Sequence, residues 1–232
     1  MAALTDEQSM IRDQAKSWVT KESPVQKFRE MRDSGIEQRF HADAWAAMID
    51  MGWTGIIIPE EHGGSNLGYL TFGIVLEEIG RQLTASPLFA SALVSASAIL
   101  LGGNDAQKQA WLPKIVDGSE VLTLAVDETP HHAPERTDLQ ATKTGSGFKL
   151  SGSKVFVLEG MAATTFVVAA RTSGQTGDKA GISLFLVSAS ANGVGRDPVS
   201  TVDSRGYANV QFNDVEVGED SVLGSIDQGF EL

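Results

Sequence analysis

The chain has 232 residues, 42% of them hydrophobic and 21% charged, which is enough to bury the core of one large domain or two modest ones. Its formal net charge of -12, without any cluster of Lys and Arg, argues against nucleic-acid binding. The absence of cysteine excludes disulfides and thiolate catalysis, and the lack of a signal pattern or a long apolar stretch leads us to expect a cytoplasmic protein that does not span a membrane.

The first half of the chain predicts helices. Apolar residues recur at helical spacing over residues 5–19, 45–52, 72–83, 87–101 and 104–115. Thr5 with Gln8, and Asn104 with Gln107, have the spacing of capping boxes that open the first and the last of these helices. We therefore expect an all-α helical domain over residues 1–118.

The spacing of the apolar residues changes near residue 120 from helical to alternating. Strands are predicted over residues 122–126, 139–143, 148–150, 155–157, 165–170, 182–186, 210–212 and 215–217. Asn213–Asp214 is expected to form a turn between the last two. Short strands with turns about every 8–12 residues favour a barrel or a sandwich. The predicted fold class is therefore α+β, with the helical domain followed by a β-barrel domain over residues 119–222.

Several stretches resemble acyl-CoA dehydrogenases, and they occur in the order in which that family uses them. They are a helix start, a helix followed by a glycine-rich loop, two helical segments, a hairpin and a late strand, at residues 4–8, 45–64, 77–81, 107–113, 147–154 and 212–217. The resemblance implies a helical N-terminal domain, a β-barrel middle domain and a C-terminal four-helix domain. Residues 223–232 resemble the start of that last, missing domain.

The resemblance also implies a function. Members of this family bind FAD between the middle and C-terminal domains and oxidise the α,β bond of an acyl-CoA thioester. The flavin takes a hydride from the β-carbon, while a glutamate of the C-terminal domain removes the α-proton. We therefore expect an FAD-dependent acyl-CoA dehydrogenase of lipid metabolism whose catalytic base lies outside this chain. The expected partners are acyl-CoA, an electron-transferring flavoprotein or similar acceptor, and other subunits in a dimer or tetramer.

Two segments match the flavin contacts of the family but depart from its usual residues. Val126 and Asp127 stand in a segment that usually reads T-E-P-x-x-G-S-D, and Asp127 replaces the threonine that meets the pyrimidine edge of the flavin. An ionised carboxylate there only accepts hydrogen bonds and repels a reduced, anionic flavin. Phe156, Val157 and Leu158 stand where the family reads W-I-T. Phe156 either stacks on the flavin or is a β-core aromatic, and Leu158 offers only its backbone N–H. These five are the candidate cofactor-binding residues.

The departures leave several hypotheses open. The chain is either a divergent enzyme that holds FAD through backbone groups and the third domain, or a non-catalytic, flavin-poor subunit that pairs with a complete sister subunit. A relative with other flavin chemistry, such as nitroalkane oxidation or hydroxylation, is a third hypothesis.

The candidate substrate-binding residues are Phe72, at the edge of an apolar helix face, and Arg136 and Arg205, as contacts for CoA phosphates. The simpler interpretation makes Phe72 a core residue and the arginines solvated surface residues. His131–His132 matches no metal-ligand spacing and is expected in a surface loop, so no metal is expected.

Overall fold

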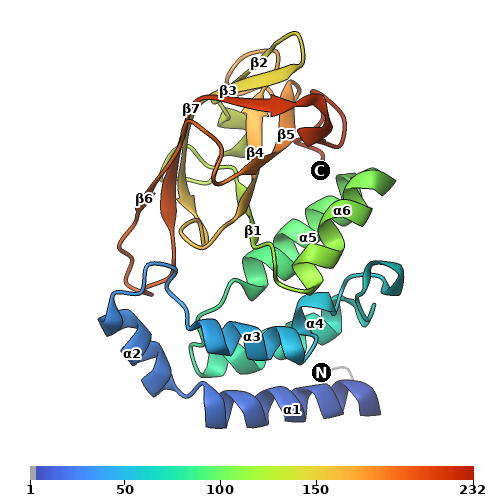
Figure 1. Cartoon of the computed structure of the whole chain (residues 1–232), viewed down its shortest axis with the longest axis vertical. Helices are drawn as coiled ribbons and strands as arrows, with labels where there is room; N and C mark the ends of the chain where they lie inside the picture. Colours follow the sequence, from blue (N-terminus) through green and yellow to red (C-terminus); the bar gives the residue numbers. More distant parts are fainter. Residues whose placement is uncertain (1–3) are drawn as a thin grey trace.

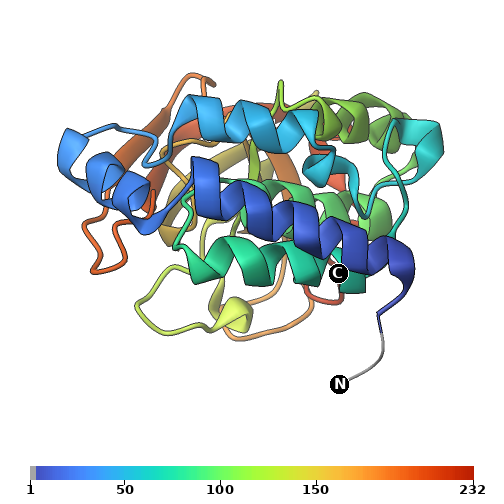
Figure 2. The ribbon, with the colours of Figure 1, turned by 90° about the horizontal axis from the view of Figure 1, so that it is seen from below.

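The computed structural model describes residues 4–232, and Figure 1 shows a layer of helices beneath a β-sheet. The helices are α1 (Asp6–Glu22), α2 (Val25–Ser34), α3 (Ala42–Asp50), α4 (Gly68–Arg81), α5 (Ala96–Gly102) and α6 (Asp105–Val116). A π-helical segment, Phe89–Ser95, leads directly into α5. Seen from below, α1, α3 and α4 cover one end of the sheet (Figure 2). None of the described helices is long and apolar enough to cross a membrane.

Side-chain caps fix the starts of α1 and α6, and both predicted capping boxes are confirmed. The Gln8 backbone N–H donates to Thr5 Oγ1 at 3.1 Å, and the Thr5 N–H donates to Gln8 Oε1 at 3.1 Å. Asn104 and Gln107 form the same reciprocal pair, with distances of 2.9 and 3.2 Å. Each box satisfies N–H groups that the helical start leaves without an intrahelical partner.

Helix α2 has no counterpart among the predicted helices. Its residues are mostly polar and only Met31 is buried, so it lacks the apolar stripe on which such a prediction depends. The helix ends at Gly35, whose φ of 72° lies in the left-handed region that favours glycine.

The second half of the chain forms one eight-stranded sheet in the order β6-β7-β3-β2-β4-β5-β8, with β1 paired to β4. The strands are β1 (Leu122–Ala125), β2 (Gln140–Lys143), β3 (Gly147–Val157), β4 (Thr165–Arg171), β5 (Ile182–Ser188), β6 (Val194–Pro198), β7 (Ala208–Gly218) and β8 (Val222–Leu223). The predicted order of a helical half and a β half is confirmed. Within the described residues the end strands β6 and β8 do not pair, so the sheet is not closed and only loosely a barrel.

The predicted turn at Asn213–Asp214 is wrong, because β7 runs through these residues. They form a bulge opposite Ser151 of β3, whose hydroxyl donates to Asp214 Oδ1 at 2.7 Å. Asp214 has a φ of 54°, in the left-handed region that aspartate tolerates better than most residues.

The last residues of the chain run back along the sheet. Residues 224–232 contain turns and no helix. The Gly229 N–H donates to the Ile182 carbonyl of β5 at 2.7 Å. The domain limits 1–118, 119–222 and 223–232 stay predictions.

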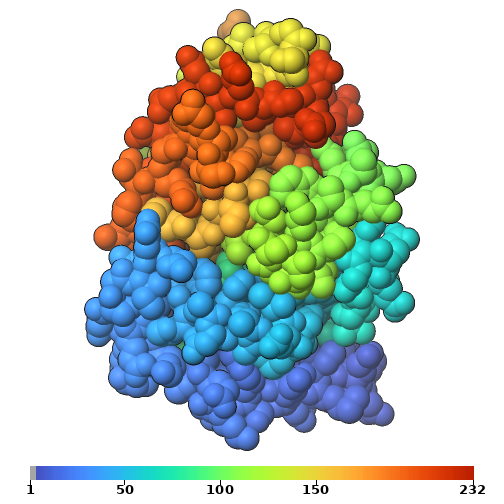
Figure 3. Space-filling view, in the orientation of Figure 1, coloured from blue at the N-terminus to red at the C-terminus, as the bar shows by residue number. Residues whose placement is uncertain are grey.

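One apolar core joins the two halves of the molecule. Trp53 and Phe72 of the helical half belong to the same buried cluster as Leu122, Val167 and Leu184 of the sheet. A second cluster fills the opposite side of the sheet. Figure 3 shows the two halves in contact along their junction. The candidate site lies at this junction.

Candidate functional site

All five candidate cofactor-binding residues line one cleft between the helices and the sheet. The cleft has a volume of about 190 Å³, and its walls come from the π-helical segment, the end of β1 and the end of β3. Val126 and Asp127 follow β1, whereas Phe156 and Val157 end β3 and Leu158 follows it. The structure thus brings together two segments that are about thirty residues apart in the sequence.

Two hydrogen bonds hold these segments side by side. The Val155 N–H donates to the Asp127 carbonyl at 2.8 Å. The Thr123 hydroxyl donates to the Leu158 carbonyl at 2.5 Å. Because both carbonyls are engaged, the backbone on both sides of the cleft has a fixed orientation.

A second bulge aims Phe156 into the cleft. Between Lys154 and Val157, β3 has two residues opposite the single residue Asn209 of β7, and Phe156 takes a φ of 50°. The Phe156 N–H donates to Asn209 Oδ1 at 3.3 Å, and the ring is 49% exposed. Such a bulge re-aims a side chain that regular alternation would direct elsewhere. Phe156 is therefore not a β-core aromatic, whereas Val157, at 2% exposed, is a core residue.

The Asp127 carboxylate is already engaged within the protein. Its two oxygens lie 3.0 and 3.1 Å from His132 Nδ1, so the Nδ1–H tautomer donates to them. The Ala133 N–H also donates to Asp127 Oδ1, at 3.2 Å. The His132 ring thus supplies a hydrogen-bond donor to the carboxylate from within the protein. The sequence places His132 in a surface loop, and spacing alone does not reveal this pair.

The cleft also presents backbone N–H groups that nothing else uses. Among the described residues, the N–H groups of Val126, Asp127 and Leu158 donate to no protein acceptor. The edge of a flavin carries carbonyl and ring-nitrogen acceptors, so these donors, together with the exposed Phe156 ring, fit the cofactor. A hydroxyl at residue 127 is not required for this fit.

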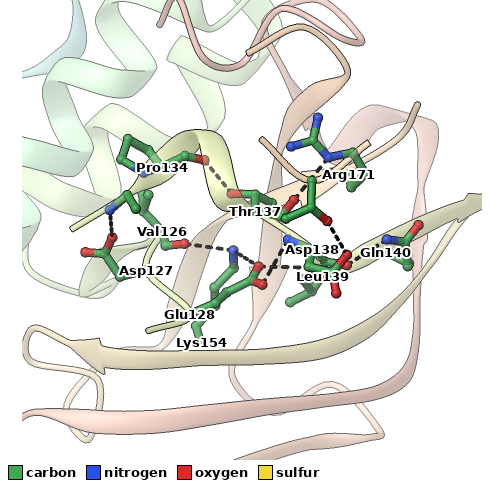
Figure 4. Close-up of polar contacts among 12 residues, drawn as sticks. Val126, Asp127, Glu128, Pro134, Thr137, Asp138, Leu139, Gln140, Lys154 and Arg171 are labelled. Carbon is green, nitrogen blue, oxygen red and sulfur yellow. Dashed lines mark hydrogen bonds and ion pairs between the residues drawn. The ribbon is translucent and has the colours of Figure 1, made fainter. Parts of the chain in front are cut away.

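A buried ion pair between Lys154 and Glu128 holds the Val126–Glu128 segment in place (Figure 4). Lys154, at 0% exposed, donates from Nζ to the Val126 carbonyl at 2.8 Å and to Glu128 Oε1 at 2.6 Å. The Glu128 carboxylate also accepts the N–H groups of Asp138 and Leu139 at 2.9 and 3.0 Å. Burial lowers the pKa of Lys154, while the neighbouring Glu128 carboxylate opposes that shift. This pair was not among the predicted site residues.

Arg171 holds the loop that follows Asp127. Its buried guanidinium donates to the Thr137 and Glu135 carbonyls, each at 3.0 Å, and to the Asp178 and Ala180 carbonyls at 3.0 and 2.9 Å. One side chain thereby ties two loops to β4, part of which is visible in Figure 4.

The three candidate substrate-binding residues lie in different surroundings. Phe72 is 0% exposed and packs in the core that joins the helices to the sheet. Arg136 is exposed on a short 3₁₀ turn, Pro134–Arg136. Arg205 is half-buried and donates from Nη1 to the Thr84 carbonyl at 3.1 Å. The structure does not bring these three together, and their contact with a substrate stays a prediction.

Known proteins match both halves of the chain. Residues 5–119 match the model for the acyl-CoA dehydrogenase N-terminal domain, and residues 125–215 match that for the middle domain. Acyl-CoA dehydrogenase FadE27 of Mycobacterium tuberculosis is 31% identical over 192 residues, which cover 83% of this chain and 49% of that protein. The (2S)-methylsuccinyl-CoA dehydrogenase of Cereibacter sphaeroides is 31% identical over 246 residues, covering 99% of this chain and 44% of that protein.

Solved structures show the same fold. The match to the ChsE4-ChsE5 complex from Mycobacterium tuberculosis has a TM-score of 0.85 at 28% identity, and it covers 98% of this chain and 60% of that one. The chain spans about half the length of the curated relatives it matches.

Proposed function

Because the chain belongs to the acyl-CoA dehydrogenase family, we propose that it forms part of an FAD-dependent enzyme that oxidises the α,β bond of an acyl-CoA thioester. One observation carries the proposal. The two segments that resemble flavin contacts line a single cleft with an exposed aromatic ring and with N–H donors that have no acceptor among residues 4–232. FAD, when bound, supplies the hydride acceptor.

The residues of this chain bind and orient rather than transfer protons. The N–H groups at residues 126, 127 and 158 hold acceptors at the edge of the cofactor. Phe156 covers one face of the cofactor and keeps water from it. Lys154 and Glu128 hold the first of these segments in position. We propose that the catalytic base comes from a domain outside residues 1–232.

We further propose that the full protein assembles into a dimer or tetramer and passes electrons to an electron-transferring flavoprotein or a similar acceptor. The similarity to a complex, ChsE4-ChsE5, supports assembly into an oligomer. A cytoplasmic location is part of the same proposal.

The visible spectrum of the purified full-length protein tests this function. We expect the absorbance of oxidised flavin and its loss when an acyl-CoA is added without oxygen. A protein that is colourless alone, and becomes coloured only with a co-expressed sister chain, would instead identify a non-catalytic subunit. Flavin that acyl-CoA does not bleach would contradict the proposed reaction.

A matched pair of variants locates the flavin. Phe156→Ala is expected to weaken FAD affinity about tenfold, since it removes a stacking surface. Val202→Ala, at a fully exposed position, is expected to leave the affinity unchanged. Equal affinity of both variants for FAD would place the flavin away from Phe156.

A further inference from the structure

A second cavity adjoins the cleft and has a different character. It has a volume of about 220 Å³ and shares Phe89, Ala90 and Leu158 with the cleft. Its remaining walls are Leu76, Ile79 and Gly80 of α4, the polar residues Thr84 and Ser86 that follow α4, and the polar residues Glu159, Asp203, Arg205 and Tyr207 of the β half. The wall that α4 forms is therefore apolar, whereas the wall that residues 159 and 203–207 form is polar.

Glu159 is the unusual member of this lining. It is 3% exposed, and its Oε2 has no hydrogen-bond partner among the described residues. It also forms no ion pair within the described part of the chain, although Arg205 lines the same cavity. Burial and the Asp203 carboxylate raise the pKa of Glu159 to about 7, while Arg205 and the Gly206 backbone N–H oppose the shift. A buried carboxyl oxygen without a partner costs about 1–3 kcal/mol, so such a group commonly has a use.

Hydrogen-bond donors accompany this free acceptor. The Arg205 side chain donates only from Nη1, to the Thr84 carbonyl. Its other guanidinium N–H groups have no partner among the described residues. The Tyr207 hydroxyl likewise makes no hydrogen bond in the described structure. Burial and the carboxylates of Asp203 and Glu159 raise the pKa of Tyr207, which keeps its hydroxyl protonated. The cavity thus offers an acceptor and donors together.

The residues that line this cavity limit the chemical groups that it can bind. A purely apolar group would give the Glu159 carboxyl no further hydrogen-bond partner, and a phosphate would be repelled by the Asp203 carboxylate. This repulsion also argues against Arg205 as a contact for a CoA phosphate. A hydroxyl group both donates and accepts, so it can satisfy Glu159 and Arg205 at once.

We propose that this cavity receives the far end of the acyl group and that Glu159, with Arg205, selects an acyl chain that carries a hydroxyl there. The proposal rests on the proposed function, because it assigns the substrate class of the same site. The apolar wall of the cavity, which includes Leu76 and Ile79 of α4, packs against the hydrocarbon part of the acyl group.

Paired ligands test the proposal on the full-length flavoprotein. Anaerobic titration calorimetry compares octanoyl-CoA with ω-hydroxyoctanoyl-CoA, and then shorter and longer pairs of the same kind. We expect the wild type to bind the hydroxylated member of the best pair about tenfold more tightly. Glu159→Leu is expected to abolish the preference, and Glu159→Gln, which still accepts a hydrogen bond, to keep most of it.

The outcomes separate this proposal from the function on which it rests. If the wild type binds both members of every pair equally, the hydroxyl selection is wrong although the dehydrogenase function stands. A preference that survives in Glu159→Leu overturns the role of Glu159. If no acyl-CoA binds at all, the proposed function fails and this proposal fails with it.

Discussion

At the residue scale, Glu159 should make the stability of the protein depend on pH. Its pKa rises from 4.5 in the unfolded chain to about 7 in the folded one. The folded state therefore holds this proton more tightly. The contribution of Glu159 to stability is fully present below the unfolded pKa and is lost as the pH rises through about 7, by roughly 3 kcal/mol at most.

Urea unfolding of the wild type and Glu159→Gln at about pH 5 and about pH 8 measures this effect. The amide cannot titrate, so the variant serves as the reference for all other groups. We expect the variant to gain stability relative to the wild type at the higher pH. A constant difference between the two proteins would show that Glu159 titrates normally.

The Lys154–Glu128 pair leads to a second prediction at this scale. Lys154→Met removes the cation but leaves the Glu128 carboxylate nearly buried, at 15% side-chain exposure. We expect a loss of roughly 3–5 kcal/mol of unfolding free energy, because an uncompensated buried charge remains. The double variant Lys154→Met, Glu128→Gln should recover part of this loss in a double-mutant cycle. Simple additivity of the two changes would contradict the pairing.

The sequence revealed some of the site residues but not others. Motif resemblance identified residues 126–127 and 156–158, and the structure brings them into one cleft. Glu128 and Lys154 lie next to these same segments in the sequence. That the lysine side chain faces inward can be inferred only once the strand register is known. Glu159 was not predicted as a site residue, because its burial depends on loops that are distant in the sequence.

At the element scale, the two capping boxes provide a matched comparison. Gln8 and Gln107 occupy the same position of their boxes, but Gln107 Nε2 also donates to the Asp220 and Val222 carbonyls at 3.0 and 2.8 Å. We expect Gln107→Ala to cost about 1–3 kcal/mol more than Gln8→Ala, because it also breaks these links to the β half. Equal losses in thermal or urea unfolding would show that the links contribute nothing.

Elements with a strong local signal were predictable, whereas those that depend on partners were not. The capping boxes and the apolar face of α4 were found because side-chain chemistry and spacing determine them. Helix α2 and strand β6 are largely polar and exposed, so neither carries an apolar pattern. Asn213–Asp214 has the composition of a turn, but pairing with β3 converts it into a bulge.

At the scale of the whole molecule, the shared core predicts that helices and sheet unfold together. All four tryptophans, Trp18, Trp45, Trp53 and Trp111, lie in the helical half, so their fluorescence reports on that half. Val168 lies in the core cluster on the side of the sheet away from the helices. Val168→Ala should cost roughly 2 kcal/mol and should lower the urea midpoint measured by fluorescence.

Val167→Ala is the control on the face of β4 that packs against the helices. We expect both variants to shift the fluorescence midpoint, because the molecule forms one cooperative unit. If only Val167→Ala shifts it, the two halves unfold separately.

The order of helices followed by strands was predictable from the change in apolar spacing, but the open edge of the sheet was not. Closure depends on which end strands meet, and β6 and β8 are short strands with weak patterns. The family resemblance predicted that two segments distant in the sequence meet at the junction. No local sequence pattern specifies that contact.

The central claim is that the junction of helices and sheet forms one wall of a flavin and thioester site. A crystal structure of the full-length protein with FAD and an acyl-CoA tests it most directly. We predict that the flavin ring lies against residues 126–127 and 156–158, with Phe156 stacked on it and the acyl chain directed toward Glu159. A flavin bound elsewhere, with Phe156 in contact only with protein, would contradict the claim.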